Sequence, residues 1–485
     1  MNESSLSVLV AASEAAPLAQ TGGLAEVTGS LPSALRDIGC RVTVVMPAYR
    51  RVLETVKTWE VAARDLPVRI GQSNLTADVL SGELVTGVPL HLVRRDEFFD
   101  RTGLYGSSQG DYFDNPERFV FFSRVIPALC SAIGFTPDVI LGNDWQTGLI
   151  MALLNQGALP RTAGVFCVHN QGFLGLVPPE RTINIGLTDR YYTMEGMEYY
   201  GQMSLLKAGI VYAQAVTTVS PSYAQEVQTP EGGHGLDGVM RSINWRLFGI
   251  LNGVDYRVWN PALDANLAAN YSPQDLSGKL ACKEDLLAAM GRSNLLDKPL
   301  LGMVTRLTPQ KGLGLLSESL EDLFKLDVGL VILGSGDARQ EEQVRQMLTR
   351  YPDRMAGRFG YDPPLAHKII AGCDMILMPS MYEPCGLAQM YGLKYGTVPV
   401  VRAVGGLNDT VKDPGNGNGQ ATGFKFGPFQ ARSLVRAVKR AVESFREKER
   451  WRTIMLAGMA EDFSWNRSAR EYLKVFEQAL SNRRG

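Results

Sequence analysis

The chain has few of the features that mark a secreted, membrane-spanning or nucleic-acid-binding protein. Its 485 residues include six cysteines, scattered with no paired spacing, so the sequence indicates neither a disulfide framework nor a zinc site. The formal net charge of −1 provides no overall field to attract nucleic acid or an anionic membrane surface. No apolar run approaches membrane length, and no basic segment precedes a signal core at the N-terminus. We therefore expect a cytoplasmic protein with no nucleic-acid or membrane partner.

Signatures of metal-held nucleotides are also missing. The sequence has no Asp-x-Asp pair and no Gly-Lys-Ser/Thr phosphate loop, which disfavours metal-dependent nucleotide chemistry and P-loop hydrolysis. The segment Gly334-Ser335-Gly336-Asp337 lacks the third glycine of a dinucleotide fingerprint, so it indicates a strand-end loop more than a nicotinamide site. Any anion site must therefore be local, and we expect no cofactor and no metal.

Both halves of the chain alternate short apolar segments with helical patterns. Strands are expected at residues 6–11, 41–46, 90–94, 139–141, 164–168 and 215–219, then at 300–304, 328–333, 375–378 and 398–401. Such alternation predicts an α/β protein with two Rossmann-like domains built on parallel sheets. We expect an N-terminal domain over residues 1–250, a C-terminal domain over 251–460 and a helix within 461–485.

The most informative segment follows the predicted strand 375–378. It places Glu383 in a tight turn, and Cys385, Gly386 and Leu387 come next, where a helix is expected to begin. N–H groups at the start of a helix favour an anion, and a carboxylate just before them faces the group that the anion carries. The pattern indicates chemistry on a phosphorylated ligand.

Two cations lie five residues apart after the predicted strand 300–304. Arg306 and Lys311 share one loop at the carboxyl end of a parallel strand, where such folds bind ligands. They could offset a diphosphate without a metal. The alternative is an exposed loop with ordinary solvated charges.

Two glycine pairs, Gly22-Gly23 and Gly405-Gly406, each follow a predicted strand. The N–H groups of the first turn could hold a phosphate or approach a sugar, or the turn could serve packing alone. The second pair repeats the pattern, which favours a functional role. Asp144 and His169 likewise follow strands, although a lone aspartate is often a helix cap and a lone histidine is often structural.

Taken together, these motifs resemble the bacterial glycogen synthases and plant starch synthases, which are retaining glycosyltransferases of the two-Rossmann-domain (GT-B) type. The resemblance is carried by Thr21-Gly-Gly-Leu-Ala-Glu26, Asp144-Trp145, His169-Asn170, Leu206-Lys-Ala-Gly209, Gly249-Ile-Leu-Asn-Gly-Val-Asp255, Arg306-Leu-Thr-Pro-Gln-Lys311, Gly360-Tyr-Asp362 and Glu383-Pro-Cys-Gly-Leu387. It implies two domains facing a deep cleft, with the C-terminal helix packing back toward the N-terminal domain.

The resemblance also implies an activity, namely transfer of glucose from ADP-glucose to the non-reducing end of an α-1,4-glucan such as glycogen, with retention and without a metal. Arg306 and Lys311 would neutralise the leaving diphosphate, and Glu383 would hold glucose hydroxyls. Asp144 and His169 would contact the sugar and acceptor sides. The donor site would also include Gln20, Gly22, Gly23, Asn252, Tyr361, Cys385, Gly386 and Leu387, and the acceptor side would include Tyr105 and Asn170.

Several positions depart from the family pattern. Gln20 stands where a lysine is usual and Glu26 where an aspartate is usual; the other departures are Asn143, Gln146, the segment from Gln171 and Val404. They leave two alternatives to a glucan synthase. One is a related retaining transferase that uses UDP-glucose or a small acceptor. The other is a catalytically weak glucan-binding protein that has kept the fold.

Overall fold

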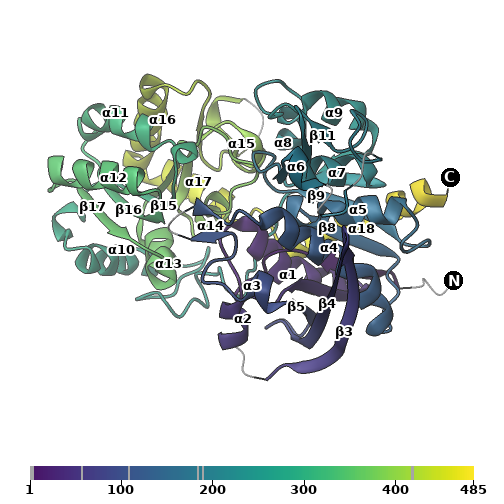
Figure 1. Ribbon diagram of the computed structural model, residues 1–485. Helices are drawn as coiled ribbons and strands as arrows, with labels where there is room; N and C mark the ends of the chain where they lie inside the picture. The colour runs from purple at the N-terminus through teal and green to yellow at the C-terminus, as the bar shows by residue number, and fades with distance from the viewer. Residues whose placement is uncertain are drawn as a thin grey trace. The chain divides into compact units, whose positions relative to one another are not determined.

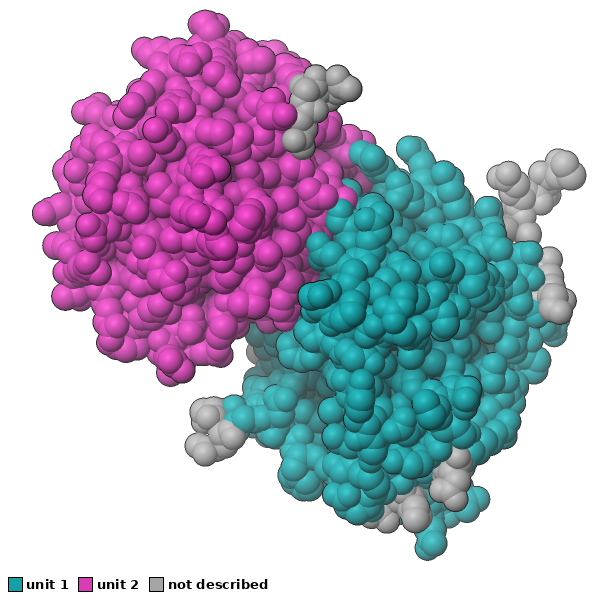
Figure 2. Space-filling view, turned by 90° about the horizontal axis from the view of Figure 1, so that it is seen from above, with its two compact units in different colours: residues 1–253, 465–485 teal, residues 254–464 magenta. Residues whose placement is uncertain are grey.

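The computed structural model describes residues 5–55, 58–107, 110–182, 185–187, 190–416 and 420–484. The chain divides into two compact units. Unit 1 contains Met1–Gly253 and Trp465–Gly485, and unit 2 contains Val254–Ser464 (Figure 2).

Unit 1 is built on one large sheet. Among the described residues this sheet has nine strands in the order β14-β13-β9-β8-β1-β2-β5-β4-β3. The strands are β1 (Ser7–Ala11), β2 (Arg41–Pro47), β3 (Glu60–Ile70), β4 (Ser73–Glu83), β5 (Pro89–Arg94), β8 (Val139–Asn143), β9 (Ala163–Val168), β13 (Ala215–Thr218) and β14 (Leu247–Gly249). The central strands β1, β8 and β9 are completely buried, as expected of parallel strands covered on both faces.

The large sheets of the two units are parallel as predicted, except at one edge of unit 1, where an antiparallel hairpin was not predicted. Strands β3 and β4 form an antiparallel hairpin, and β4 pairs antiparallel with β5. Most of β3 is exposed or half-buried, so its sequence contains no continuous apolar run that would have marked it as a strand.

The helices of unit 1 precede or follow these strands (Figure 1). They are α1 (Gly23–Asp37), α2 (Arg50–Thr55), α3 (Asp96–Phe99), α4 (Asn115–Ala132), α5 (Gly148–Asn155), α6 (Pro179–Thr182), α7 (Leu205–Tyr212), α8 (Pro221–Glu226) and α9 (Asp237–Ser242). Short strands β6 (Gly106–Ser107) and β7 (Gly110–Asp111) pair with each other, and β10 (Leu176–Val177), β11 (Glu198–Tyr199) and β12 (Gln202–Ser204) form a small antiparallel sheet.

The C-terminal helix α18 (Trp465–Arg484) packs on unit 1, against α1 and β9. Tyr472 and Phe476 are fully buried, and the Ser468 hydroxyl donates to the Leu251 carbonyl at 2.7 Å. The expected apolar face of the last helix therefore covers the N-terminal unit, as predicted.

Unit 2 is a parallel sheet in the strand order β17-β16-β15-β18-β19-β20. The strands are β15 (Leu300–Leu307), β16 (Gly329–Gly336), β17 (Met355–Phe359), β18 (Met375–Met378), β19 (Val398–Arg402) and β20 (Phe424–Phe426). The helices are α10 (Gly278–Ala289), α11 (Leu313–Phe324), α12 (Ala338–Arg350), α13 (Pro363–Gly372), α14 (Ala388–Lys394), α15 (Gly405–Thr410), α16 (Ala431–Arg446) and α17 (Lys448–Met459).

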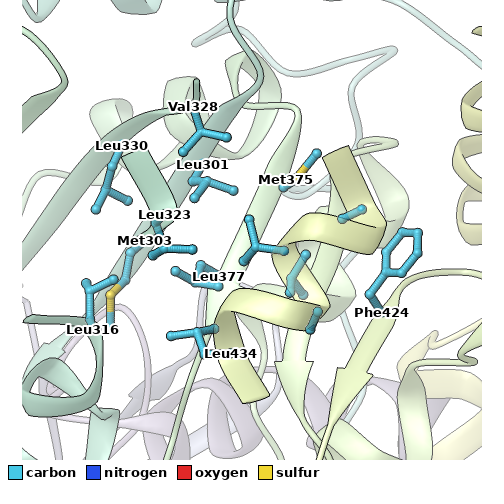
Figure 3. Close-up of a cluster of buried hydrophobic side chains, with 14 of the residues drawn as sticks. Leu301, Met303, Leu316, Leu323, Val328, Leu330, Met375, Leu377, Phe424 and Leu434 are labelled. Atoms are coloured by element: carbon cyan, nitrogen blue, oxygen red, sulfur yellow. The ribbon is translucent and has the colours of Figure 1, made fainter. Parts of the chain in front are cut away.

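Both faces of this sheet are covered. One core joins side chains of α11, α12, α16 and α17 to Leu301, Met303 and Leu377 of the strands, as Figure 3 shows in part. A second core joins α10 and α13 to the opposite face. This double cover fixes the strands, so that their carboxyl ends can hold loops in defined positions.

Candidate active site

Glu383 lies in the loop after β18 and is 6% exposed. Lys311 Nζ donates to both of its carboxylate oxygens, at 2.8 and 2.6 Å, and the Ser380 hydroxyl donates to Oε2 at 2.9 Å. The sequence-predicted cation and carboxylate therefore form a buried ion pair. Because a buried charge is costly unless it is paired, each of the two residues fixes the position of the other.

The loop that carries Lys311 is bound along its length to the loop that carries Glu383. Gln310 accepts from the Met381 N–H at 2.7 Å, and its side-chain amide donates to the Tyr382 carbonyl at 3.0 Å. Gly312 follows with φ +75°, and a Cβ there would lie 2.1 Å from the Pro379 carbonyl oxygen. Only glycine fits this position, so the close approach of the two loops is specified by the sequence.

The second glycine pair serves to pack against the Glu383 loop. A Cβ at Gly405 would lie 2.0 Å from the Glu383 carbonyl oxygen, and one at Gly406 would lie 2.2 Å from the Cys385 carbonyl oxygen. The Gly406 N–H donates to the Glu383 carbonyl at 3.1 Å. The second glycine pair therefore supports the backbone of the Glu383 loop.

The backbone after Glu383 offers free donors. Helix α14 begins at Ala388, so Gly386 and Leu387 precede it, and within the described chain no residue accepts from their N–H groups. Gly386 has φ +72°, and Gln389 Nε2 donates to its carbonyl oxygen, which holds the turn. Cys385 is buried at 4% exposure, and its carbonyl accepts from Gln389 Nε2 at 3.1 Å.

Arg306 lies at the carboxyl end of β15 and is exposed. Its guanidinium makes no ion pair or hydrogen bond with any residue in the described ranges, in contrast to Lys311. Tyr361 lies after β17 in the same parallel sheet and is 76% exposed. Both side chains are therefore available to a ligand at the carboxyl edge of unit 2.

In unit 1 the first glycine turn is organised by a residue that the sequence analysis missed, Glu14. Its buried carboxylate accepts from the Thr21 N–H at 2.5 Å, the Thr21 hydroxyl at 2.6 Å and the Gly22 N–H at 3.4 Å. Tyr105 donates to the same carboxylate at 2.6 Å. Two of the N–H groups expected to face a phosphate thus already face a carboxylate, and the helix itself begins at Gly23.

Tyr105, predicted on the acceptor side, belongs to this network. Its hydroxyl also lies 2.7 Å from the Ser13 hydroxyl, and burial beside Glu14 raises the pKa of Tyr105 well above its ordinary value. The phenol therefore remains protonated and links the glycine turn to the loop before α4.

Gln20 and Glu26, two positions that depart from the family pattern, contact each other. Gln20 Nε2 donates to Glu26 Oε1 at 2.7 Å. Residue 20 is thus held over the first turn of α1 by its own neighbour, whatever else it contacts in a complex.

Asp144 and His169 are brought together at the ends of β8 and β9. Asp144 has φ +54°, and its carboxylate accepts from the His169 N–H at 2.8 Å and from the Asn170 N–H at 3.5 Å. A non-glycine residue in the left-handed region persists only when its surroundings fix it. Asn170 directs its side-chain oxygen to the Gly172 N–H at 3.0 Å, within its own loop.

Asn143 determines which ring nitrogen of His169 carries the proton. Asn143 Nδ2 donates to the carbonyls of Ala11 and Leu141, so its Oδ1 faces His169 Nε2 at 2.9 Å. The imidazole must therefore carry its proton on Nε2 and present Nδ1 as an acceptor. Burial lowers the pKa of His169 to about 3, so the ring is neutral at physiological pH.

The pKa of Asp144 is raised to about 7, chiefly by burial and further by the Glu14 carboxylate. The folded protein then binds this proton more tightly than the unfolded chain between about pH 4 and pH 7, so the free energy of unfolding falls as pH rises through that window. Asp144→Asn should abolish this dependence, because the amide has nearly the same shape as the carboxyl group and still offers an oxygen to the two N–H groups, but does not titrate. In thermal melts, the melting temperature of the variant minus that of wild type should be larger at pH 8 than at pH 5. A difference in melting temperature that stays constant over that range would contradict the raised pKa of Asp144.

Asn252, predicted to bind the donor, lies at the end of unit 1 and is 5% exposed, with its side-chain oxygen unpartnered among the described residues. The described residues contain no group of three or more His, Cys, Asp and Glu side chains that could hold a metal ion. None of the helices in the described ranges is long and apolar enough to cross a membrane.

Comparisons with known proteins place this geometry in a family. Residues 7–242 match the model for the starch synthase catalytic domain, and residues 290–454 match the model for glycosyl transferases group 1. The chain is 45% identical to a glycogen synthase of Desulfatibacillum aliphaticivorans over 482 residues, which cover 99% of this chain and 100% of that protein. It is 46% identical to a glycogen synthase of Syntrophotalea carbinolica over 480 residues, which cover 98% and 99% of the two chains.

Solved structures agree with these matches. The catalytic domain of starch synthase IV from Arabidopsis thaliana, bound to ADP and acarbose, superposes with a TM-score of 0.90 at 31% identity, covering 99% of this chain and 100% of that one. Sucrose-phosphate synthase from Thermosynechococcus elongatus shares the fold, with a TM-score of 0.62 at 16% identity and coverage of 98% and 99%. The chain therefore belongs to the family of GT-B glycosyltransferases that comprises the bacterial glycogen synthases and the plant starch synthases.

Proposed function

We propose that this protein is a glycogen synthase that transfers glucose from ADP-glucose to the 4-hydroxyl at the non-reducing end of an α-1,4-glucan, with retention of configuration. The observation that carries the proposal is the buried Lys311–Glu383 pair, with unused N–H groups at Gly386 and Leu387 in the same loop. This combination suits a ligand that joins a sugar to a diphosphate.

In the proposed reaction the bond between the glucose C1 and the diphosphate breaks, and a bond forms from C1 to the acceptor oxygen. Negative charge builds on the leaving phosphate, where Arg306, Lys311 and the two backbone N–H groups would stabilise it. The acceptor hydroxyl attacks from the face that the diphosphate leaves, and its proton passes to the departing phosphate. Arg306 and Lys311 would stabilise this charge without a metal ion.

Glu383 is suited to holding sugar hydroxyls rather than to attacking C1. Both of its oxygens already accept from Lys311, and one also accepts from Ser380, so the carboxylate would be a weak nucleophile. A double displacement would need an unencumbered carboxylate next to the anomeric carbon. Attack by the acceptor hydroxyl on the face that the diphosphate leaves needs no nucleophilic carboxylate.

The remaining side chains have separate roles. In unit 2, the exposed ring of Tyr361 would contact the nucleotide base. In unit 1, neutral His169 would accept a hydrogen bond from a sugar hydroxyl at Nδ1, beside Asp144. ADP as the nucleotide is supported by the ADP in the starch synthase structure, and the six free, buried cysteines support work in the reducing cytoplasm.

One assay tests the proposal against its alternatives. The protein is supplied with ADP-glucose, UDP-glucose or neither, together with glycogen or a small acceptor and with EDTA present, and nucleoside diphosphate release and chain growth are measured. We expect growth of glycogen from ADP-glucose. Turnover only with a small acceptor would overturn the proposal, and so would retention of glycogen with no turnover of either donor.

Gln20 allows a specific prediction about the donor. Gln20→Lys should lower the KM for ADP-glucose by about two- to fivefold at low ionic strength, because a partly exposed cation adds up to about 1 kcal/mol toward a phosphate. The gain should shrink in high salt. Gln20→Met, which removes the amide without adding charge, is the control. An unchanged KM in the lysine variant would mean that Glu26 holds residue 20 away from the phosphates.

A further inference from the structure

The hairpin of β11 and β12 ends in an unusual turn. Tyr200 and Gly201 join the two strands with φ +46° and +82°, and the side chain of Tyr200 is 78% exposed. A bulky residue with positive φ is strained, and asparagine or glycine would adopt this turn at lower cost. The protein therefore holds an aromatic ring in solvent on a backbone that disfavours it.

A buried cation holds this hairpin rigidly. Lys207, 5% exposed at the start of α7, donates from Nζ to the carbonyls of Met194 and Glu198 at 2.7 and 2.6 Å. Burial lowers the pKa of Lys207 below its ordinary value. The Ser204 hydroxyl adds a bond of 2.7 Å to the Leu174 carbonyl. Strain at Tyr200 persists because these contacts determine the hairpin.

The ring of Tyr200 is also oriented. It meets the ring of Tyr199 edge-on, with centroids 4.8 Å apart and an angle of 85°, and the Tyr199 hydroxyl donates to the His234 carbonyl at 2.8 Å. A Cβ at Gly235 would lie 3.1 Å from the Tyr200 ring, so the adjoining loop supports one side of it. The rest of the ring faces solvent.

The Tyr200 hairpin is connected to the Asp144–His169 pair of unit 1 by hydrogen bonds through buried Gln171. Gln171, two residues after His169, donates from Nε2 to the Gly233 carbonyl at 2.6 Å, next to the loop that supports Tyr200. Phe173, in the same segment as Gln171, is 56% exposed. Side-chain hydrogen bonds from Gln171 and Tyr199 to the 233–235 loop therefore connect the segment after His169 to the Tyr200 hairpin within one unit.

We propose that Tyr200 is a stacking platform for a glucose unit of the acceptor glucan, away from the reacting end. The apolar C–H face of a pyranose matches an aromatic face, while the hydroxyls at its edge stay hydrated. A rigid platform binds a flexible chain with less loss of entropy than a mobile side chain would. The inference rests on the proposed function for the identity of the ligand, an α-1,4-glucan.

The test is binding of glycogen and of maltoheptaose without any donor, measured by affinity electrophoresis and calorimetry. Tyr200→Asn removes the ring and keeps the left-handed turn, so we expect about tenfold weaker binding with no loss in melting temperature. Tyr200→Phe should bind as wild type does. Trp245→Ala is the control for the loss of an exposed aromatic, because Trp245 precedes β14 in unit 1 and lies outside the three-stranded sheet that carries the Tyr200 hairpin.

Kinetics separate this inference from the proposed function. In the asparagine variant the KM for glycogen should rise about tenfold, while kcat and the KM for ADP-glucose stay unchanged. If the wild-type protein bound glycogen without turning over ADP-glucose, the proposed function would fail while the binding test still stood. Equal glycogen affinity of the asparagine variant and wild type would overturn the platform, including the case in which the ring serves a protein partner instead.

Discussion

Glu383→Gln is expected to lower kcat by about 10²–10³-fold, the usual effect of removing one preorganised polar group from a transition state. The amide cannot neutralise Lys311, so the ammonium would lose its fixed position as well as its partner. Both the hold on the sugar and the stabilisation of the diphosphate would therefore weaken. Steady-state rates with ADP-glucose and glycogen, taken well below the melting temperature of the variant, measure this.

Unit 2 contains a matched control for that substitution. Lys283 and Asp374 form a second buried pair, at 2.8 Å, and Asp374 also accepts from the Leu300 N–H. Asp374→Asn should destabilise the fold about as much as Glu383→Gln, by about 3–5 kcal/mol, because each leaves a buried ammonium without its counter-ion. Only Glu383→Gln should slow the folded enzyme. Similar rate losses in both variants would show that Glu383 acts through stability alone.

Arg306→Ala is expected to lower kcat/KM for ADP-glucose by about 10²-fold and to weaken inhibition by ADP. Its exposed guanidinium has no partner among the described residues, so its removal should leave the melting temperature close to that of wild type. Arg306→Lys should recover part of the loss, since an ammonium supplies the charge without the two-pronged geometry that fits a phosphate.

Arg436, an exposed arginine on α16, provides the comparison for general charge effects. Arg436→Ala should leave kcat/KM unchanged at every salt concentration. If the two alanine variants lost affinity for ADP equally, the loss would reflect the overall charge of the unit, and the assignment of Arg306 to the diphosphate would be wrong.

The sequence predicted the buried parallel strands well and missed what depends on distant contacts. The apolar run 375–378 matches β18 at both ends, because a short buried strand is marked by its own residues. Glu14 could not be found in this way. Its role comes from Tyr105, which is 91 residues away in the chain, and from a turn that no local pattern connects to it.

Departures from a family pattern were also hard to interpret before the contacts were known. Asn143 suggested a weakened site, yet its side chain accepts from His169 and fixes the tautomer of that ring. The strain at Asp144 and at Tyr200 is a property of the backbone, which the residue type alone does not reveal. Local sequence patterns thus predicted most of the candidate site residues. The roles of Glu14 and Asn143, which orient them through hydrogen bonds, are visible only in the folded structure.

The carboxylate of Glu14 has a thermodynamic consequence for the first glycine turn. Because it accepts from Thr21 and Gly22 within the protein itself, the conformational entropy of that turn is lost during folding, before any substrate arrives. Substrate binding need not order this part of unit 1, and more of the interaction free energy remains as affinity. Glu14 thereby keeps the turn ordered before a ligand binds.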